Sequence, residues 1–312
     1  MARGPFRGSN ALPPAVTRRA LAERFVSYPE GNAVLARALV KAVIPDAITA
    51  GGNLGRLLPA ALDRAGHPAR IRSRATVVKV RNLSGGGVEA VYEKSGQLFS
   101  VRGNAAVLNI GAWVAKHIIE DLPDRQRAAL DRYYYAPILM VSVALRNWRF
   151  LDKLGFSAAR WFDGTGFYGN IRRPMLPAAG PPAPFHPNKP IVMTIYVPFP
   201  RADLPLEAQG ADARSELLST PYAVYERRIV EQLTEMFWRG GFDAKRDIAG
   251  IVLNRWGHAF VTPPPGFYFA SAGEIASAKI FDHPFGRIAI GPSEDWLGSA
   301  LGGSSAVKKV IA

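Results

Sequence analysis

Residues 164–169 read Gly-Thr-Gly-Phe-Tyr-Gly, which is the spacing of a loop that holds a dinucleotide pyrophosphate. Such a loop works only between a β-strand and a helix whose N-terminal amides face the phosphates. The residues that follow cannot form that helix, because they carry the prolines Pro174, Pro177, Pro181, Pro182 and Pro184. No Asp or Glu lies between Phe185 and Pro200 to bind a ribose. The sequence therefore predicts a glycine turn in a surface loop here, not a phosphate site.

Other reactive residues are sparse. His258 follows Trp256 in the stretch Asn254–Phe260 (NRWGHAF), where it has the chemistry of an acid–base group or of a histidine hydrogen-bonded in a loop. The other histidines are isolated and show no metal-ligand spacing, and the chain has no cysteine, so we predict no metal site. Ser293 lacks the second glycine of a nucleophile elbow. These patterns identify no catalytic residue.

An aromatic cluster follows His258 and surrounds three consecutive prolines. Its members are Trp256, Phe260, Phe267, Tyr268 and Phe269. Such a cluster has two interpretations. Its side chains pack against one another within a loop, or they form one wall of a site for a flat cofactor or an apolar substrate. Periodicity alone does not decide between the two.

Composition indicates a packed globular protein. The 312 residues are 48% hydrophobic with a net charge of +14. The longest apolar run, 136–145, is too short to cross a bilayer, so we expect no transmembrane segment. No signal peptide is visible, which leaves a cytoplasmic location as the default expectation. The basic residues are scattered and form no nucleic-acid-binding motif, so we expect no nucleic-acid partner.

The elements that would position these residues follow from periodicity. A short strand at 24–28 and a glycine turn precede a helix at 33–44, which Pro45 ends. Alternating segments at 75–80, 88–94 and 98–103 predict a three-stranded antiparallel meander. The meander leads into 105–111, an apolar run typical of a strand buried on both faces of a parallel sheet.

The second half of the chain adds further elements. We expect a helix over 123–135 that ends in three tyrosines, and an amphipathic helix over 221–238. Two apolar runs predict a second sheet, and a buried strand is expected near the C-terminus. These strands cover 137–145, 191–199 and 286–291.

Taken together, these segments resemble the flavin-dependent amine oxidase superfamily, and within it the spermidine-dehydrogenase-like branch. The matching stretches run from about Phe25 to Glu294. They are 28–45, 75–80 with its meander, 143–156, 217–233, 240–260 and 284–295. The elements NRWGHAF and GRIAIGPSED, in that spacing after ALRNW, carry most of the resemblance.

The resemblance implies an α/β fold with α+β elements. A partial FAD/NAD(P)-binding domain of the glutathione-reductase type, with its β-meander, would occupy 24–120 and 251–312. A substrate domain of mixed sheet and helices would occupy 121–250, with 1–23 as the remnant of a preceding substrate-domain portion.

The same resemblance implies a set of site residues. Gly31 and Asn32 would approach the isoalloxazine of FAD, Val77 the adenine, and Trp256 the flavin ring. The remaining cofactor contacts would come from Gly111, Gly291, Ser293 and Glu294. The substrate pocket for a small amine would include His258, Phe260 and Tyr268. The implied reaction is hydride transfer to the flavin from a C–H beside an amine nitrogen.

The chain also departs from the family pattern. The family opens with a βαβ unit whose G-x-G-x-x-G binds the FAD pyrophosphate, and this unit is not found here. We therefore expect a domain that is incomplete as given, and a second chain as one way to supply the nucleotide-binding unit. A non-catalytic truncated remnant, or a partner-completed subunit of the same fold, is the alternative.

Overall fold

The computed structural model describes residues 26–28, 31–49, 55–174, 185–269, 276–282 and 284–292. Contacts divide the chain into two compact units. Unit 1 comprises 1–71, 138–199 and 216–256, and unit 2 comprises 72–137, 200–215 and 257–312. The expected domain limits at 120/121 and 250/251 differ from these bounds. The expected limits separate a cofactor-binding part from a substrate-binding part. Contacts within the chain do not test that division, so it stays a prediction.

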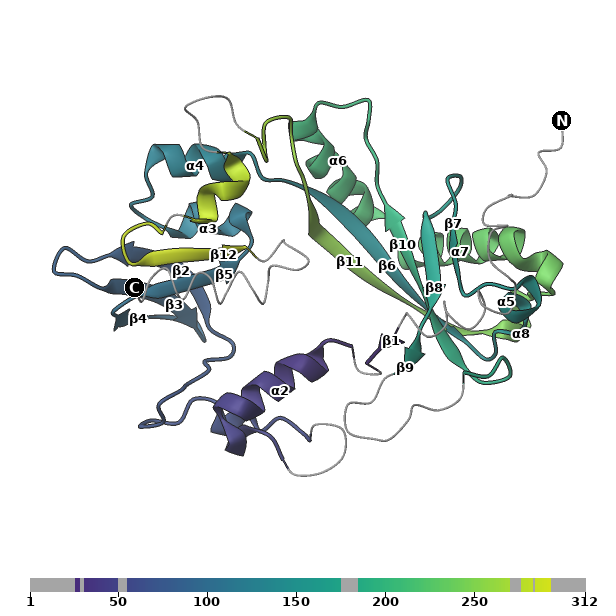
Figure 1. Ribbon diagram of the computed structural model, residues 1–312, viewed down its shortest axis with the longest axis horizontal. Coiled ribbons are helices and arrows are strands. Elements are labelled where there is room, and N and C mark those ends of the chain that lie inside the picture. The colour runs from purple at the N-terminus through teal and green to yellow at the C-terminus, as the bar shows by residue number, and fades with distance from the viewer. Residues whose placement is uncertain are drawn as a thin grey trace. The chain divides into compact units, whose positions relative to one another are not determined.

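A five-stranded sheet organises unit 1, with the strand order β11-β6-β10-β8-β7 (Figure 1). Its strands are β6 (Tyr134–Leu145), β7 (Ala158–Arg160), β8 (Tyr168–Ile171), β10 (Ile191–Pro198) and β11 (Ile248–Thr262). β10 pairs antiparallel with both β6 and β8. The expected second sheet from the apolar runs at 137–145 and 191–199 is therefore confirmed.

One face of this sheet packs on the main core of unit 1. Alternate residues of β6 are buried there, and Val141 and Val143 pair in register with the buried Ile195 and Met193 of β10. Two helices cover the core, α5 (Arg149–Leu154) and α7 (Tyr222–Phe237). The amphipathic helix expected at 221–238 is thus present, with a buried stripe formed by Tyr225, Ile229, Leu233 and Phe237.

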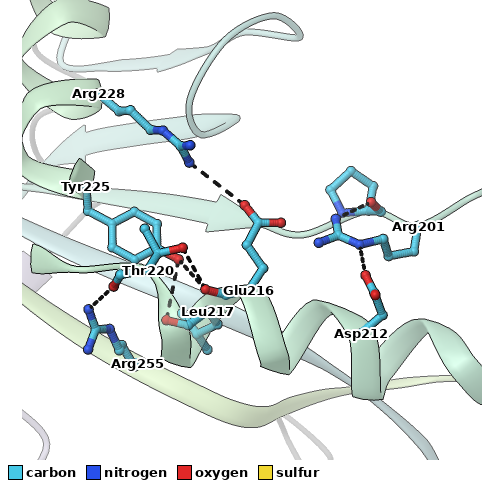
Figure 2. A network of polar contacts seen from close by, with 9 residues as sticks. Arg201, Asp212, Glu216, Leu217, Thr220, Tyr225, Arg228 and Arg255 are labelled. Atoms are coloured by element: carbon cyan, nitrogen blue, oxygen red, sulfur yellow. Dashed lines mark hydrogen bonds and ion pairs between the residues drawn. The ribbon is translucent and has the colours of Figure 1, made fainter.

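The turn before α7 is held by polar contacts at the end of α6 (Leu206–Ser219). Figure 2 shows the Tyr225 hydroxyl donating to the Leu217 carbonyl oxygen at 3.4 Å. Arg228 forms an ion pair with Glu216 at 3.8 Å, and Arg255 donates to the Thr220 carbonyl oxygen at 2.7 Å. The Tyr225 and Arg255 contacts satisfy carbonyl groups that the end of a helix leaves unpaired.

The N-terminal part of unit 1 contains a helix and two short 3₁₀ turns. β1 (Val26–Ser27) pairs in parallel with β9 (Arg173–Pro174). α2 spans Ala33–Val43 and ends two residues before Pro45, as expected. The 3₁₀ turns η1 (Pro45–Ala47) and η2 (Pro59–Ala61) pack with Ile44 and Leu62 in a small core. Unit 1 also contains η3 (Trp238–Gly240) and α8 (Ala244–Asp247).

Unit 2 is built on the predicted meander. Its antiparallel strands are β2 (Thr76–Asn82), β3 (Val88–Lys94) and β4 (Gln97–Gly103). A parallel pair, β5 (Ala106–Ile110) and β12 (Ile288–Pro292), shares a core with the meander through Val80, Val88, Leu108 and Ile288. Unit 2 also contains the helices α3 (Ala112–Ile118) and α4 (Asp124–Asp131) and the 3₁₀ turn η4 (Ser277–Asp282). The first ten residues of α6, the start of β6 and the end of β11 belong to unit 2 as well.

Three expectations need correction. β5 is not buried on both faces: Leu108 packs in the core, but Val107 on the other face is 36% exposed. α4 ends at Asp131, and Tyr134 and Tyr135 begin β6 instead of ending a helix. The stretch 254–260, expected as a loop, lies within β11.

No helix in the described part of the chain is long and apolar enough to cross a membrane. In the same residues, no three His, Cys, Asp or Glu side chains gather in a way that could hold a metal ion.

Candidate functional sites

The G-x-G-x-x-G stretch joins two strands, β7 and β8, and opens no helix. Gly164 and Gly166 have positive φ, +74° and +90°, and both lie close to other side chains. A Cβ on Gly164 would lie 2.0 Å from Gln232 Oε1, and one on Gly166 would lie 2.9 Å from the Trp161 ring. Gln232 Oε1 accepts a hydrogen bond from the Thr165 amide at 2.8 Å. The predicted glycine turn is confirmed, although Gly169 lies inside β8 and is buried.

Two of the expected cofactor residues are brought together in unit 2. β5 and β12 run in parallel, with Gly291 opposite Asn109 and Pro292 opposite Ile110. Gly111 follows Ile110 directly, so both glycines lie at the carboxyl end of this strand pair. This is the end of a parallel sheet at which open α/β folds bind their ligands. The remaining expected residues of this junction, Ser293 and Glu294, lie outside the described residues.

Val77 lies on the meander of unit 2. The strand register places Val77 opposite Tyr92, and Tyr92 opposite Phe99. The Tyr92 and Phe99 rings stack with centroids 5.5 Å apart, and the Arg72 guanidinium lies 5.5 Å from the Tyr92 centroid. Val77 and Phe99 are both exposed, so this face offers a flat apolar and aromatic surface.

Gly31, Asn32 and Trp256 belong to unit 1. Gly31 has φ +67°, a conformation that favours glycine. Its carbonyl oxygen accepts a hydrogen bond from the amide of Val34 in the first turn of α2. The Asn32 side chain makes no capping hydrogen bond. Trp256 projects from β11 and is 56% exposed. Because Val77 belongs to the other unit, a common flavin groove for all these residues stays a prediction.

His258 lines a cavity of about 200 Å³ that lies entirely within unit 2. Four segments form its walls: the start of α3, the end of α4 with the start of β6, one side of α6, and β11. The His258 ring stacks on Trp113 with centroids 4.1 Å apart and planes 11° apart. Tyr135 meets the same ring edge-on at 5.7 Å. Trp113, Tyr135 and His258 therefore form an aromatic corner of the cavity.

The charge state of this corner follows from its surroundings. Burial, and then the positive charge of Arg214, lower the pKa of His258. The imidazole is therefore neutral near pH 7, with one nitrogen able to accept a proton or a hydrogen bond. Such a group has the chemistry of a weak base or of a polar contact to a ligand.

The other two residues expected in the substrate pocket do not line this cavity. Phe260 and Tyr268 are 53% and 57% exposed. Tyr268 instead contacts the buried Phe267 edge-on, with centroids 5.0 Å apart, and Phe267 packs on Tyr133. Part of the aromatic cluster is thus loop packing. The substrate role of His258, Phe260 and Tyr268 stays a prediction.

Sequence reasoning did not identify the other residues of this cavity. Trp113, Glu207 and Arg214 come from helices that were not predicted, and they lie far from His258 in the chain. One local signal was present. Glu207, Gly210 and Arg214 recur at helical spacing, which places an acid, a glycine and a base on one face of α6.

Comparison with solved structures gives matches at low sequence identity. A wild-type putrescine oxidase bound to putrescine matches 76% of this chain and 49% of its own, with a TM-score of 0.50 and 13% identity. A cyclohexylamine oxidase from Brevibacterium oxydans IH-35A matches 75% and 46%, with a TM-score of 0.48 and 15% identity. A fatty acid isomerase from P. acnes matches 78% and 49%, with a TM-score of 0.49 and 9% identity.

No protein-family model and no curated protein sequence matches this chain. The chain spans about half the length of the solved structures described above. At 13% identity, the match to the putrescine oxidase defines the fold alone. This chain therefore has a mixed α/β fold similar to part of an amine oxidase fold.

The described residues at the carboxyl end of β5 and β12 include two glycines. Gly111 has an extended backbone, with φ −61° and ψ 139°, and the glycine beside it on β12 likewise has no side chain. Gly111 is half-buried and Gly291 is buried, and neither places a side chain at this end. Among the described residues, no strand-to-helix turn carries the full pyrophosphate fingerprint.

Proposed function

We propose that this chain forms part of an FAD-dependent amine oxidoreductase, of the spermidine-dehydrogenase-like type, that removes hydride from a C–H beside an amine nitrogen. The observation that carries the proposal is the parallel pair β5–β12, with a glycine at the carboxyl end of each strand and the meander packed beside it. The fold similarity to a putrescine oxidase is consistent with this proposal.

Bound FAD would supply the hydride acceptor. Gly111 and Gly291 would admit the cofactor to the strand ends, and the Val77–Tyr92–Phe99 face of the meander would provide an apolar surface for a planar ring. Ser293, Glu294, Gly31, Asn32 and Trp256 complete the proposed contacts. The proposed substrate is a small amine with an apolar body.

Uptake of FAD by the full chain tests the proposal. Purified protein would be incubated with FAD, alone and together with a polypeptide carrying a strand–G-x-G-x-x-G–helix unit, and separated from free FAD. We expect flavin absorbance to stay with the protein in at least one of these conditions. Anaerobic addition of putrescine or cyclohexylamine should then bleach the flavin.

Two glycine variants make the test specific. Gly111→Val places a branched side chain where FAD is proposed to approach the strand end. The extended backbone at Gly111 is a conformation that valine adopts. We expect FAD binding to weaken by about tenfold or more, as overpacking of a tight contact does. Gly85→Val is the matched control in the same unit, because a Cβ there meets no atom within 4 Å. Equal binding by both variants would place FAD elsewhere.

A second candidate function is a non-catalytic or partner-completed subunit of the same fold. Three exposed apolar side chains favour this candidate: Val77, Phe99 and Val107. They lie on strands that another polypeptide could cover. This candidate predicts protein that stays colourless in every condition above. It further predicts a stoichiometric complex with another chain on size-exclusion chromatography.

A further inference from the structure

Arg214 contributes a charge to the cavity of unit 2 that no acidic side chain neutralises. Its Nη1 donates a hydrogen bond to the Tyr135 carbonyl oxygen at 3.2 Å. No carboxylate within the described residues lies at ion-pair distance from this guanidinium. Burial lowers the pKa of Arg214, yet an arginine keeps its proton at neutral pH. Several of its N–H donors are thus left for a ligand that lies in the cavity.

The other charged groups that face the cavity already have partners. Lys116 Nζ forms an ion pair with Asp131 Oδ1 at 2.7 Å. The Tyr134 hydroxyl donates to Glu207 Oε1 at 3.3 Å. Glu207 and Arg214 lie two turns apart on α6, and neither has an oppositely charged side chain at ion-pair distance among the described residues. The neutral form of His258 is favoured, and Arg214 is the charge that lowers its pKa, so the positive charge at the aromatic corner is that of Arg214. A guanidinium in partly desolvated surroundings attracts an anion, and its planar fork matches a carboxylate.

The size and walls of the cavity limit the ligand. A dry protein cavity of about 150 Å³ holds one benzene molecule. At about 200 Å³, this cavity has room for one ring and a small polar group. Trp113 and Tyr134 supply aromatic surface along the walls. Gly210 allows α6 to approach β6 closely, since a Cβ there would lie 2.3 Å from the Tyr135 carbonyl oxygen. This close approach fixes Arg214 relative to the aromatic corner.

We propose that this cavity binds a small organic carboxylate of about the size of one ring, with the carboxylate held by Arg214 and the apolar body against Trp113. His258, beside the guanidinium, contributes one further hydrogen bond to the ligand. This assignment does not depend on flavin binding. It gives the cavity an occupant different from the amine of the proposed function.

Binding should leave a signature on His258. The charge of Arg214 contributes to the low pKa of this histidine. A bound carboxylate offsets that charge, so the pKa of His258 should rise when the ligand binds. Several charged and titratable groups surround the ring: Arg214, Lys116, Asp131, Glu207 and the lining tyrosines. Among these groups, only Arg214 contributes to the lowered pKa of His258.

Benzoate binding to the full chain tests the proposal. Calorimetry would give the affinity, and the His258 ring proton resonances, followed by NMR across pH 5 to 8, would give the pKa shift. The variant Arg214→Gln should weaken binding by about tenfold or more, because a hydrogen bond to a charged group is lost. Arg214→Lys keeps the charge without the fork and should bind with intermediate affinity. Arg125→Gln, which removes an exposed arginine of α4, should bind like the parent chain.

Each remaining outcome contradicts the proposal. Benzylamine is the matched cationic probe, and binding of benzylamine in place of benzoate would assign the cavity to a cation held by Glu207. Equally tight binding of inorganic phosphate, with the same dependence on Arg214, would make it a general anion site. The absence of binding by all three probes, in a chain whose circular dichroism shows that it is folded, would also overturn the assignment.

Discussion

The carboxylate of Asp247 is expected to stabilise unit 1 in a strongly pH-dependent way. Its side chain is 1% exposed. The carboxylate accepts hydrogen bonds from Arg246 Nη2 at 2.7 Å, from the Asp243 amide at 2.9 Å and from Asn147 Nδ2 at 3.0 Å. Burial alone would raise the pKa of Asp247, but these hydrogen bonds outweigh it and lower the pKa from 3.8 to about 2.

The magnitude follows from proton linkage. A pKa that is lower in the folded than in the unfolded state gives stability that is fully present above the unfolded value. That stability is lost as the pH falls towards the folded value. At about 1.4 kcal/mol for each pKa unit, the lowering corresponds to about 2 kcal/mol at neutral pH. Asp247→Asn should therefore reduce the free energy of unfolding of unit 1 by about 2 kcal/mol at pH 7.

Urea denaturation followed by tryptophan fluorescence, at several pH values between 2 and 7, measures this effect. The difference between parent and Asp247→Asn should shrink as the pH falls from 4 to 2. Asp152→Asn is the matched control, because Asp152 is exposed on α5 and its carboxylate makes no hydrogen bond or ion pair within the described residues. A difference that stays constant over the whole pH range would refute the role of the ionised carboxylate.

Two substitutions, one in each unit, test the packing, and each is compared with a control substitution. Gly210→Ala should destabilise unit 2 by about 1–3 kcal/mol, since the added Cβ would lie 2.3 Å from the Tyr135 carbonyl oxygen. Gly250→Ala, where a Cβ meets no atom within 4 Å, should change the melting temperature little. Leu233→Ala should cost unit 1 about 2–5 kcal/mol, because the side chain is 1% exposed. Leu218→Ala removes a side chain that is 60% exposed, and urea denaturation should show almost no loss of stability.

The elements predicted correctly are those whose signal is local. The meander follows from alternation interrupted by glycine turns, and in the structure Gly86, Gly87 and Gly96 have positive φ at those turns. α7 follows from apolar residues at helical spacing over four turns. Each of these patterns needs only its own segment to be recognised.

The predictions that failed depend on distant parts of the chain. β11 carries arginine, glycine and histidine, residues that indicate a loop when taken alone. It is a strand because it pairs with β6 in the sheet. The burial of β5 depends on which elements pack against its two faces, which its own sequence does not specify. The cavity around His258 is assembled from four separated segments, so no window of sequence contains it.

The glycines of this chain show why spacing alone does not define a phosphate site. The three at 164–169 have the full fingerprint, yet Gln232 and Trp161 account for the absence of side chains there. Gly111 and Gly291 belong to no G-x-G-x-x-G motif, but they lie together at the carboxyl ends of parallel strands, the end at which open α/β folds bind ligands. The position of a glycine relative to the ends of parallel strands therefore indicates a ligand site better than its spacing in the sequence does. For this reason the Gly111→Val variant, and not a substitution within 164–169, distinguishes a flavin site from a packing turn.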